Sequence, residues 1–249
     1  MRIAAAQIAA VVGDIEGNFN RHLEMIDIAI ANQADLIVFP EMSITGYCRK
    51  EAKNLVIAST NPIITEFKKI SDRNDLMIIA GAPINIEFRL FIGAYILQPN
   101  QEPEVYTKQF LHEGESEFYS SSFDYNPIIR FKEESIQFAI CADINHPQHP
   151  KNAKANNCTL YVPSIFYSQK GIGEGHEILA KYAEKNSLQV LMSNYSGDLW
   201  GMKAGGKSAF WDKNGIKILQ LSGDEEGLLL LEKMKADWSA KKITKDIPV

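Results

Sequence analysis

The sequence predicts an α/β fold in which mixed sheets are covered by helices, and it predicts that residues 1–249 form one domain. Short apolar runs alternate along the chain with segments whose apolar residues recur every three or four positions. No repeat, low-complexity tract or linker rich in Pro, Gly and Ser interrupts this alternation. A chain of 249 residues that is 45% hydrophobic can also bury a large core, so one domain is sufficient.

Helices are predicted where the apolar period is three to four residues. The first covers residues 18–32, in which apolar side chains recur at this spacing. The second fits residues 61–73, where Asn61 can cap the first turn and Pro62 occupies a position that needs no backbone N–H. Two more helices are expected near residues 148–156 and 174–186.

Strands are predicted where a short apolar run is bounded by a turn or a proline. Residues 36–39 are apolar throughout and are followed by Pro40, which is typical of a buried strand and its exit. Residues 212–215 have the composition of a turn. The predicted strands are residues 2–8, 36–39, 76–80, 91–97, 104–107, 128–131, 136–140, 159–162, 189–192, 207–211 and 227–231.

The charge distribution argues against nucleic-acid or membrane binding. The formal net charge is -5 and no block of Lys and Arg is present, so the chain has no electrostatic reason to bind a polyanion. The first eight residues resemble a weak signal peptide, but Asp14 and Glu16 interrupt them, and a core strand is the better interpretation. No run approaches the roughly 18 apolar residues of a membrane span.

The cysteines indicate a reducing compartment. Cys48, Cys141 and Cys158 are odd in number and form no CxxC pair, so free thiols are expected, at most one of them reactive. We therefore expect a cytoplasmic protein.

Three polar side chains directly follow predicted strands. These are Glu41, Lys108 and Cys141. Because ligand sites in open α/β sheets gather beyond the carboxyl ends of strands, the three side chains could converge. Each also has an ordinary interpretation: a small buried apolar residue for the cysteine, a solvated or helix-capping glutamate, and a surface lysine.

The sequence around these residues resembles the nitrilase superfamily, the carbon–nitrogen hydrolases. Three blocks carry the resemblance in order: LIVFPEMSITGY at 36–47, YTKQFLH at 106–112 and FAICADINHP at 138–147. The similarity runs from residue 2 to about 232. Supporting similarities are Ala6-Gln7 with Asp14 and Asn18, SNYSG at 193–197 and GGKS at 205–208.

The resemblance implies a four-layer α-β-β-α sandwich and a Glu-Lys-Cys triad. Cys141 would be the nucleophile, Glu41 the general base, and Lys108 an ammonium that favours the thiolate and stabilises the oxyanion. The backbone N–H of Ala142 would be the second oxyanion donor. The reaction would pass through a thioester and requires neither cofactor nor metal.

The resemblance also suggests a second glutamate near the lysine and several substrate contacts. Glu113, Glu115 and Glu117 compete for the first role, and Glu115 matches the pattern best, although a solvated acidic loop is an equal alternative. Candidate substrate-binding residues are Tyr47, His112, Asn145 and Phe166.

The expected activity is hydrolysis of a small linear amide or N-carbamoyl compound, with release of ammonia. The alternatives are a nitrilase and a catalytically silent scaffold of the same fold. Departures from the family pattern at 120–122 (Ser-Ser-Ser) and 144–146 (Ile-Asn-His) leave substrate identity open. A homodimer or higher homo-oligomer is expected from the resemblance, and Trp238 and Ile243 would serve an interface or pack the tail.

Two further segments invite other interpretations. His146-Pro147-Gln148-His149-Pro150 suggests a metal site, but the prolines favour a turn and no third ligand has matching spacing. Residues 171–176 resemble a glycine-rich nucleotide loop but lack the GxGxxG spacing, so a loop that enters a helix, and that could lie near the substrate, is preferred.

Overall fold

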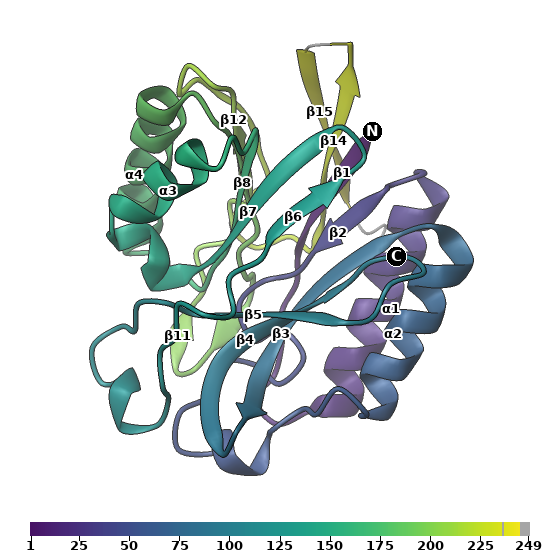
Figure 1. The fold of residues 1–249 in the computed structure, drawn as a ribbon, viewed down its shortest axis with the longest axis vertical. Coiled ribbons are helices and arrows are strands. Elements are labelled where there is room, and N and C mark those ends of the chain that lie inside the picture. Colours follow the sequence, from purple (N-terminus) through teal and green to yellow (C-terminus); the bar gives the residue numbers. More distant parts are fainter. Residues whose placement is uncertain (236, 245–249) are drawn as a thin grey trace.

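Two β-sheets lie face to face between two pairs of helices, as Figure 1 shows. This computed structural model describes residues 1–235 and 237–244. The predicted four-layer α-β-β-α sandwich is confirmed. The predicted domain 1–249 includes residue 236 and residues 245–249, which lie outside the described residues. The covering helices are α1 (Ile15–Ala31) and α2 (Pro62–Asn74) on one side, and α3 (Gln148–Ala155) and α4 (Ile172–Asn186) on the other.

The first sheet has seven strands in the order β15-β14-β1-β2-β3-β4-β5. Its central strands β1, β2 and β3 are parallel, and the outer strands are antiparallel to their neighbours. The bounds are β1 (Arg2–Gln7), β2 (Leu36–Val38), β3 (Met77–Ile86), β4 (Arg89–Leu97), β5 (Glu104–Thr107), β14 (Gly227–Met234) and β15 (Asp237–Thr244).

The second sheet has six strands in the order β13-β12-β9-β8-β7-β6. Strands β7, β8 and β9 are parallel. The bounds are β6 (Ile128–Phe131), β7 (Glu134–Ile140), β8 (Leu160–Ser164), β9 (Gln189–Met192), β12 (Ala209–Trp211) and β13 (Lys217–Gln220), beside a small hairpin of β10 (Asp198–Leu199) and β11 (Met202–Lys203).

Three separate apolar cores hold the four layers together. Successive side chains of a strand point to opposite faces, and β1 illustrates the consequence. Ile3 and Ala5 pack between the two sheets, whereas Ala4 and Ala6 pack under α1 and α2. A third core lies between the six-stranded sheet and α3 and α4. Strands buried on both faces must be apolar throughout, which is why they were visible in the sequence.

The helix starts follow capping chemistry. Asn61 caps α2 as predicted, because its Oδ1 accepts a hydrogen bond from the Ile63 N–H at 2.9 Å. Helix α1 begins before the predicted residue 18, because the Asp14 side chain caps it by accepting from the Gly17 N–H at 3.0 Å. The first turn has no regular apolar spacing, so the sequence pattern placed the start of the helix too late.

Four strands were not predicted, and the edge strand β15 shows why. Most of its side chains alternate between exposed and half-buried, and two adjacent lysines, Lys241 and Lys242, are both exposed, so it contains no apolar run. Trp238 and Ile243 lie in this strand and pack partly against the cores of their own chain. The missed strands are β10, β11, β13 and β15.

A search of the helices across residues 1–235 and 237–244 found none that combines the length and apolarity needed to cross a bilayer.

Candidate active site

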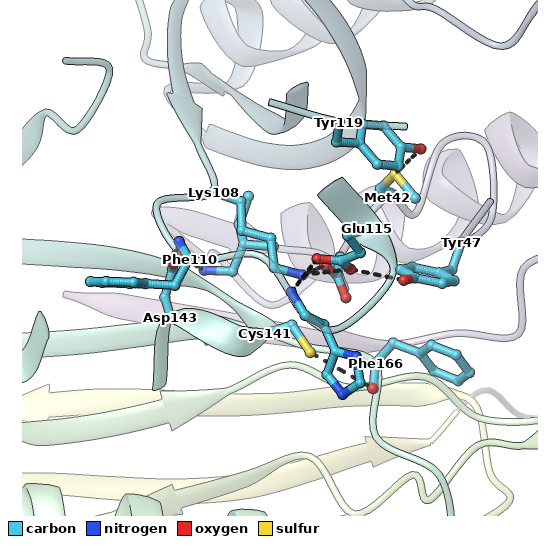
Figure 2. A network of polar contacts seen from close by, with 12 residues as sticks. Met42, Tyr47, Lys108, Phe110, Glu115, Tyr119, Cys141, Asp143 and Phe166 are labelled. Atoms are coloured by element: carbon cyan, nitrogen blue, oxygen red, sulfur yellow. Dashed lines mark hydrogen bonds and ion pairs between the residues drawn. The ribbon is translucent and has the colours of Figure 1, made fainter. Parts of the chain in front are cut away.

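Side chains from both sheets meet beyond the strand ends. Glu41 follows β2 and Lys108 follows β5, both in the seven-stranded sheet, whereas Cys141 follows β7 in the six-stranded sheet. Figure 2 shows Lys108, Glu115 and Cys141 pointing into one region between the sheets. The three residues that strand-end placement singled out are thus neighbours in space.

Lys108 is the centre of a buried ionic cluster. Its Nζ donates to Glu41 Oε1 at 2.7 Å and to Glu115 Oε1 at 2.9 Å. The side chains of Lys108, Glu41 and Glu115 are 0%, 1% and 1% exposed. Buried ions must be paired and hydrogen-bonded to be tolerated, and in this cluster one ammonium serves two carboxylates.

Glu115 is the one of the three competing glutamates that the structure brings to the lysine. It begins a short 3₁₀ helix, η2 (Glu115–Glu117), and also accepts from the Tyr47 hydroxyl at 2.8 Å and from the His112 backbone N–H at 2.7 Å. Glu113 and Glu117 are exposed.

Cys141 occupies a strained turn. It begins the 3₁₀ helix η3 (Cys141–Asn145) with a φ of 40°, in the left-handed region that residues with a Cβ disfavour. Its thiol donates to the Phe166 carbonyl at 3.9 Å and lines a cavity of about 90 Å³ together with Glu41 and Glu115. Ala142, buried, follows it in the same turn.

The pKa values of Glu41, Cys141 and Lys108 are all raised, but burial is the cause in only the first two. Burial raises the pKa of Glu41 to about 7, with Glu115 adding to the rise and Lys108 opposing it. Burial also raises the pKa of the Cys141 thiol, helped by the Glu41 charge and opposed by Lys108. For Lys108, burial acts to lower the pKa, but the charges of Glu41, Cys141 and Glu115 outweigh it and hold the pKa well above its usual value.

The resting cysteine is therefore a neutral thiol beside a carboxylate. Lys108 acts on the thiol in the direction that the sequence suggested, but burial and the Glu41 charge outweigh it. A thiol in this state reacts when a neighbouring base accepts its proton, and Glu41 has the pKa of such a base near pH 7.

The turn that carries Glu41 is held from both sheets. Gly81 in β3 lies so close that a Cβ there would sit 2.5 Å from the Met42 backbone nitrogen, so no larger residue fits. From the other sheet, the Tyr195 hydroxyl donates to the Glu41 carbonyl at 2.5 Å, and the Ser164 hydroxyl donates to the Phe39 carbonyl at 2.7 Å.

Asp143 connects the nucleophile turn to the lysine segment, a role that sequence reasoning missed. One carboxylate oxygen accepts from the backbone N–H groups of Gln109 and Phe110 at 3.0 and 2.9 Å. The other accepts from the Ile140 N–H at 2.9 Å and from the Tyr106 hydroxyl at 2.6 Å. The sequence feature that could have indicated this role is an acidic residue two positions after Cys141, within residues 138–147.

The candidate substrate-binding residues lie around two connected cavities. Tyr47, His112 and Phe166 line the inner cavity with Cys141. Asn145 lines an adjoining outer cavity of about 720 Å³, together with His112 and Phe166. Around the inner cavity, sequence reasoning missed three further lining residues: Arg49, Trp200 and Met202.

The other family-like segments hold the site rather than line the inner cavity. The Asn194 side chain donates to the Gly206 carbonyl at 2.8 Å, and its backbone N–H donates to the Ser208 hydroxyl at 3.0 Å, so the segments 193–197 and 205–208 are joined. Asn18 donates to the Val11 and Ile44 carbonyls at 2.8 and 3.2 Å, which ties the N-terminal loop to the Glu41 turn.

The two histidines of the proline-rich segment, His146 and His149, have different surroundings and do not face a common site. His149 is buried and contacts the Tyr161 and Tyr106 hydroxyls at 2.9 and 3.0 Å, whereas His146 stacks on Phe110 with ring centroids 3.7 Å apart. Within the described part of the chain, no group of three or more His, Cys, Asp or Glu side chains is arranged to hold a metal ion. Gly171, at the start of α4, lines the outer cavity.

Comparisons with known proteins point to one family. A family model described as carbon–nitrogen hydrolase matches residues 2–240. A glutamine-dependent NAD(+) synthetase of Aquifex aeolicus is 25% identical over 248 residues, which cover 92% of this chain and 41% of the synthetase. Omega-amidase YafV of Yersinia enterocolitica is 24% identical over 200 residues, which cover 80% of this chain and 75% of that protein. The chain thus spans less than half the length of the synthetase.

Solved amidase structures share the fold. The NitN amidase of Nesterenkonia sp. AN1 superposes with a TM-score of 0.85 at 19% identity, covering 95% of this chain and 94% of that one. Another structure of an amidase from that source, with a TM-score of 0.84 at 18% identity, covers 92% of this chain and 89% of that one and carries the acetamide moiety of fluoroacetamide on its active-site cysteine.

Proposed function

The chain belongs to the carbon–nitrogen hydrolase family, and from this premise we propose that it hydrolyses a small linear amide or N-carbamoyl compound and releases ammonia. As a member of this family it is a hydrolase of carbon–nitrogen bonds other than peptide bonds. The observation that carries the proposal is that Glu41 and Cys141 line one cavity, with the buried Lys108 ammonium bonded to Glu41 at 2.7 Å.

In the acylation step, the Cys141 sulfur attacks the amide carbon while the Glu41 carboxylate takes the thiol proton. The carbonyl oxygen becomes an oxyanion, for which the Lys108 ammonium and the Ala142 backbone N–H are the proposed donors. When the carbon–nitrogen bond breaks, Glu41 returns the proton to the leaving nitrogen. Ammonia departs, and a Cys141 thioester remains.

In the deacylation step, Glu41 takes a proton from water, and the resulting hydroxide attacks the thioester. The carbon–sulfur bond breaks, the acid leaves, and the proton returns to the Cys141 sulfur. Glu115 touches Lys108 at 2.9 Å and, with Glu41, keeps its ammonium charged, so its proposed role is to position the lysine through both half-reactions.

Amide cleavage is preferred to nitrile cleavage because of the relatives. The curated and solved relatives reported above are amidases or a glutamine-dependent synthetase, and an omega-amidase matches over 75% of its own length. The cavity of about 90 Å³ also suits the small amide end of a substrate.

The test is to follow ammonia release from a panel of small amides and matched nitriles, and to weigh the quenched enzyme for an acyl adduct on Cys141. Cys141→Ala should lower kcat by on the order of 10⁶-fold, as removal of a nucleophile does in hydrolases with a comparable triad. Cys158→Ala is the matched control, since Cys158 is buried near Ser135. Unchanged ammonia release from Cys141→Ala would refute the mechanism, and turnover of nitriles alone would refute the choice of amides.

A further inference from the structure

The inner cavity contains a cation that the proposed reaction does not use. From its geometry we propose that Arg49 binds a carboxylate at the far end of the substrate, so that the preferred substrates are monoamides of small dicarboxylic acids. This inference rests on the proposed amidase function and narrows its substrate class. It concerns residues that line the cavity together with Cys141.

Arg49 is held in place by Tyr47 and Trp200. Its Nε donates to the Tyr47 hydroxyl at 2.9 Å, and its guanidinium carbon lies 4.5 Å from the centroid of the Trp200 ring. Gly114 leaves room for it, because a Cβ at that position would lie 2.8 Å from Nη1. A guanidinium fixed by stacking and by one hydrogen bond is preorganised to bind a ligand with its remaining groups.

The two terminal nitrogens of Arg49 have no acceptor among the described residues. The hydrogen bond through Nε is the one polar contact of this side chain in the described part of the chain. Arg2 shows the usual alternative, since its guanidinium donates to Glu232 Oε1 and to Gln33 Oε1. The free Nη1 and Nη2 groups of Arg49 form a fork that matches the two oxygens of a carboxylate.

The unused donors of Arg49 favour an anion at this end of the cavity. The carboxylates of Glu41 and Glu115 both bond to Lys108, and neither has a hydrogen bond to Arg49 among the described residues. A neutral amide with an apolar far end would leave Nη1 and Nη2 without an acceptor. A substrate carboxylate would supply two acceptor oxygens there.

The cavity shapes limit the length of such a substrate. Arg49 and Cys141 both line the inner cavity of about 90 Å³, so one short molecule can reach both. Arg49 also lines the outer cavity, but Glu113 and Glu174 add negative charge there, which disfavours a carboxylate placed farther out. Short chains such as succinamate and glutaramate fit these conditions.

The experiment compares each anionic amide with a neutral amide of the same shape. Succinamate and glutaramate are paired with 4-oxopentanamide and 5-oxohexanamide, in which a methyl ketone replaces the carboxylate. The unmodified chain should show a kcat/KM about 10- to 100-fold higher for the anionic member of a pair, the effect of a charge-assisted hydrogen bond. Arg49→Met should lower kcat/KM for the anionic member of a pair about 10- to 100-fold more than for the neutral member, which removes the preference. Arg73→Met, at an exposed arginine of α2, is the matched control and should leave the preference unchanged.

Two results would overturn the inference while leaving the proposed function standing. One is the absence of any preference for the anionic amides in the unmodified chain. The other is an equal loss of activity on both members of a pair in Arg49→Met, which would mean that Arg49 only supports Tyr47. A binding measurement separates the two proposals: calorimetry of glutaramate with Cys141→Ala should show a Kd about 10- to 100-fold weaker once Arg49→Met is added. Equal glutaramate affinities of Cys141→Ala and of the double variant would refute the carboxylate site. If the affinities differ as expected but the unmodified chain hydrolyses no amide, the amidase reaction alone would be refuted.

Discussion

The floor and the rim of the inner cavity are built in opposite ways. The floor consists of Glu41, Glu115 and Cys141, which line the cavity, and of Lys108, which lies behind the two carboxylates. Glu41, Lys108 and Cys141 follow strand ends, Glu115 lies in the η2 turn, and the three charged side chains are almost completely buried. The rim (Arg49, His112, Trp200 and Met202) comes from loops and a short hairpin, and Trp200 is 43% exposed. Strand ends fix atoms to within the tolerance that bond-making chemistry requires, whereas loops are free to vary the selection of substrates.

From this difference between floor and rim we expect substitutions in the floor to reduce activity strongly and substitutions in the rim to reduce it little. A floor residue is restrained by several partners, so its removal disturbs charge and geometry together. A rim residue lines the cavity and has fewer partners, so we expect its removal to alter affinity or selectivity more than kcat.

The largest effect at the floor, beyond loss of the nucleophile itself, is expected for Glu41→Gln. The amide cannot accept the thiol proton, so kcat should fall by about 100- to 10,000-fold, the range of general base catalysis. Glu177→Gln, at an exposed position of α4, is the matched control. Near-normal rates at pH 7 would remove Glu41 from the role of base.

Lys108→Met comes next, with an expected loss of about 100- to 1,000-fold in kcat, as for removal of one oxyanion donor. Because Glu41 and Glu115 would then be buried without their counter-charge, the free energy of unfolding should also fall, by about 3–5 kcal/mol. Denaturant titration measures this change. Lys181→Met, which removes an exposed ion pair with Glu177, should alter neither quantity, and equal behaviour of the two variants would contradict the comparison.

Asp143→Asn tests a residue beneath the floor that does not line the inner cavity. Both oxygens of the Asp143 carboxylate accept hydrogen bonds from backbone N–H groups, so the side-chain NH₂ of an asparagine would place a donor against a donor. This repulsion should displace the Cys141 turn and lower kcat by about 10- to 100-fold. KM should change little, because the rim stays intact. A change confined to KM would show that Asp143 does not position the nucleophile.

The pH profile should show an acid limb near pH 7. The Glu41 pKa is raised, so the carboxylate loses its ability to take a proton as the pH falls through about 7. Below that value kcat/KM should fall about tenfold per pH unit. A flat profile between pH 5 and 8 would contradict this assignment, and Glu41→Gln should lack the limb.

The smallest effect is expected at the rim, for Trp200→Leu. Loss of its stacking with Arg49 should raise KM about two- to fivefold, the effect of a cation–π contact of modest strength, with kcat retained. Steady-state kinetics on an anionic amide measure both constants. A fall in kcat as large as that expected for Lys108→Met would contradict the prediction that rim residues affect KM and not kcat.

The floor could be predicted from the sequence because each of its elements is local. The run at 36–39 and the proline that follows define a strand end, and the residue after it is placed by the chain itself. Similarity to a family then supplied the partners. Which of the three neighbouring glutamates turns inward was settled by the η2 turn, whose burial no periodicity reveals.

The rim and the clamps could not be predicted because they depend on distant pairs. Arg49 contacts Trp200, which is about 150 positions away in the sequence. Trp200 lies in the β10–β11 hairpin, whose strands are too short to have an apolar pattern. The bonds from Asp143 to the Gln109 and Phe110 N–H groups likewise link segments that only the packed sheets bring together. Tertiary contacts of this kind leave no periodic trace along the chain.

The location of the base and the thiol on different sheets has a consequence for the newly made chain. The Ser164 and Ser193 hydroxyls bond to the Phe39 and Ala6 carbonyls across the sheet interface, and Cys141 has Glu41 beside it only when the two sheets are packed in this way. A base-assisted thiol therefore arises in the same event that completes assembly of the molecule, so hydrolytic activity reports directly on the docking of one sheet against the other.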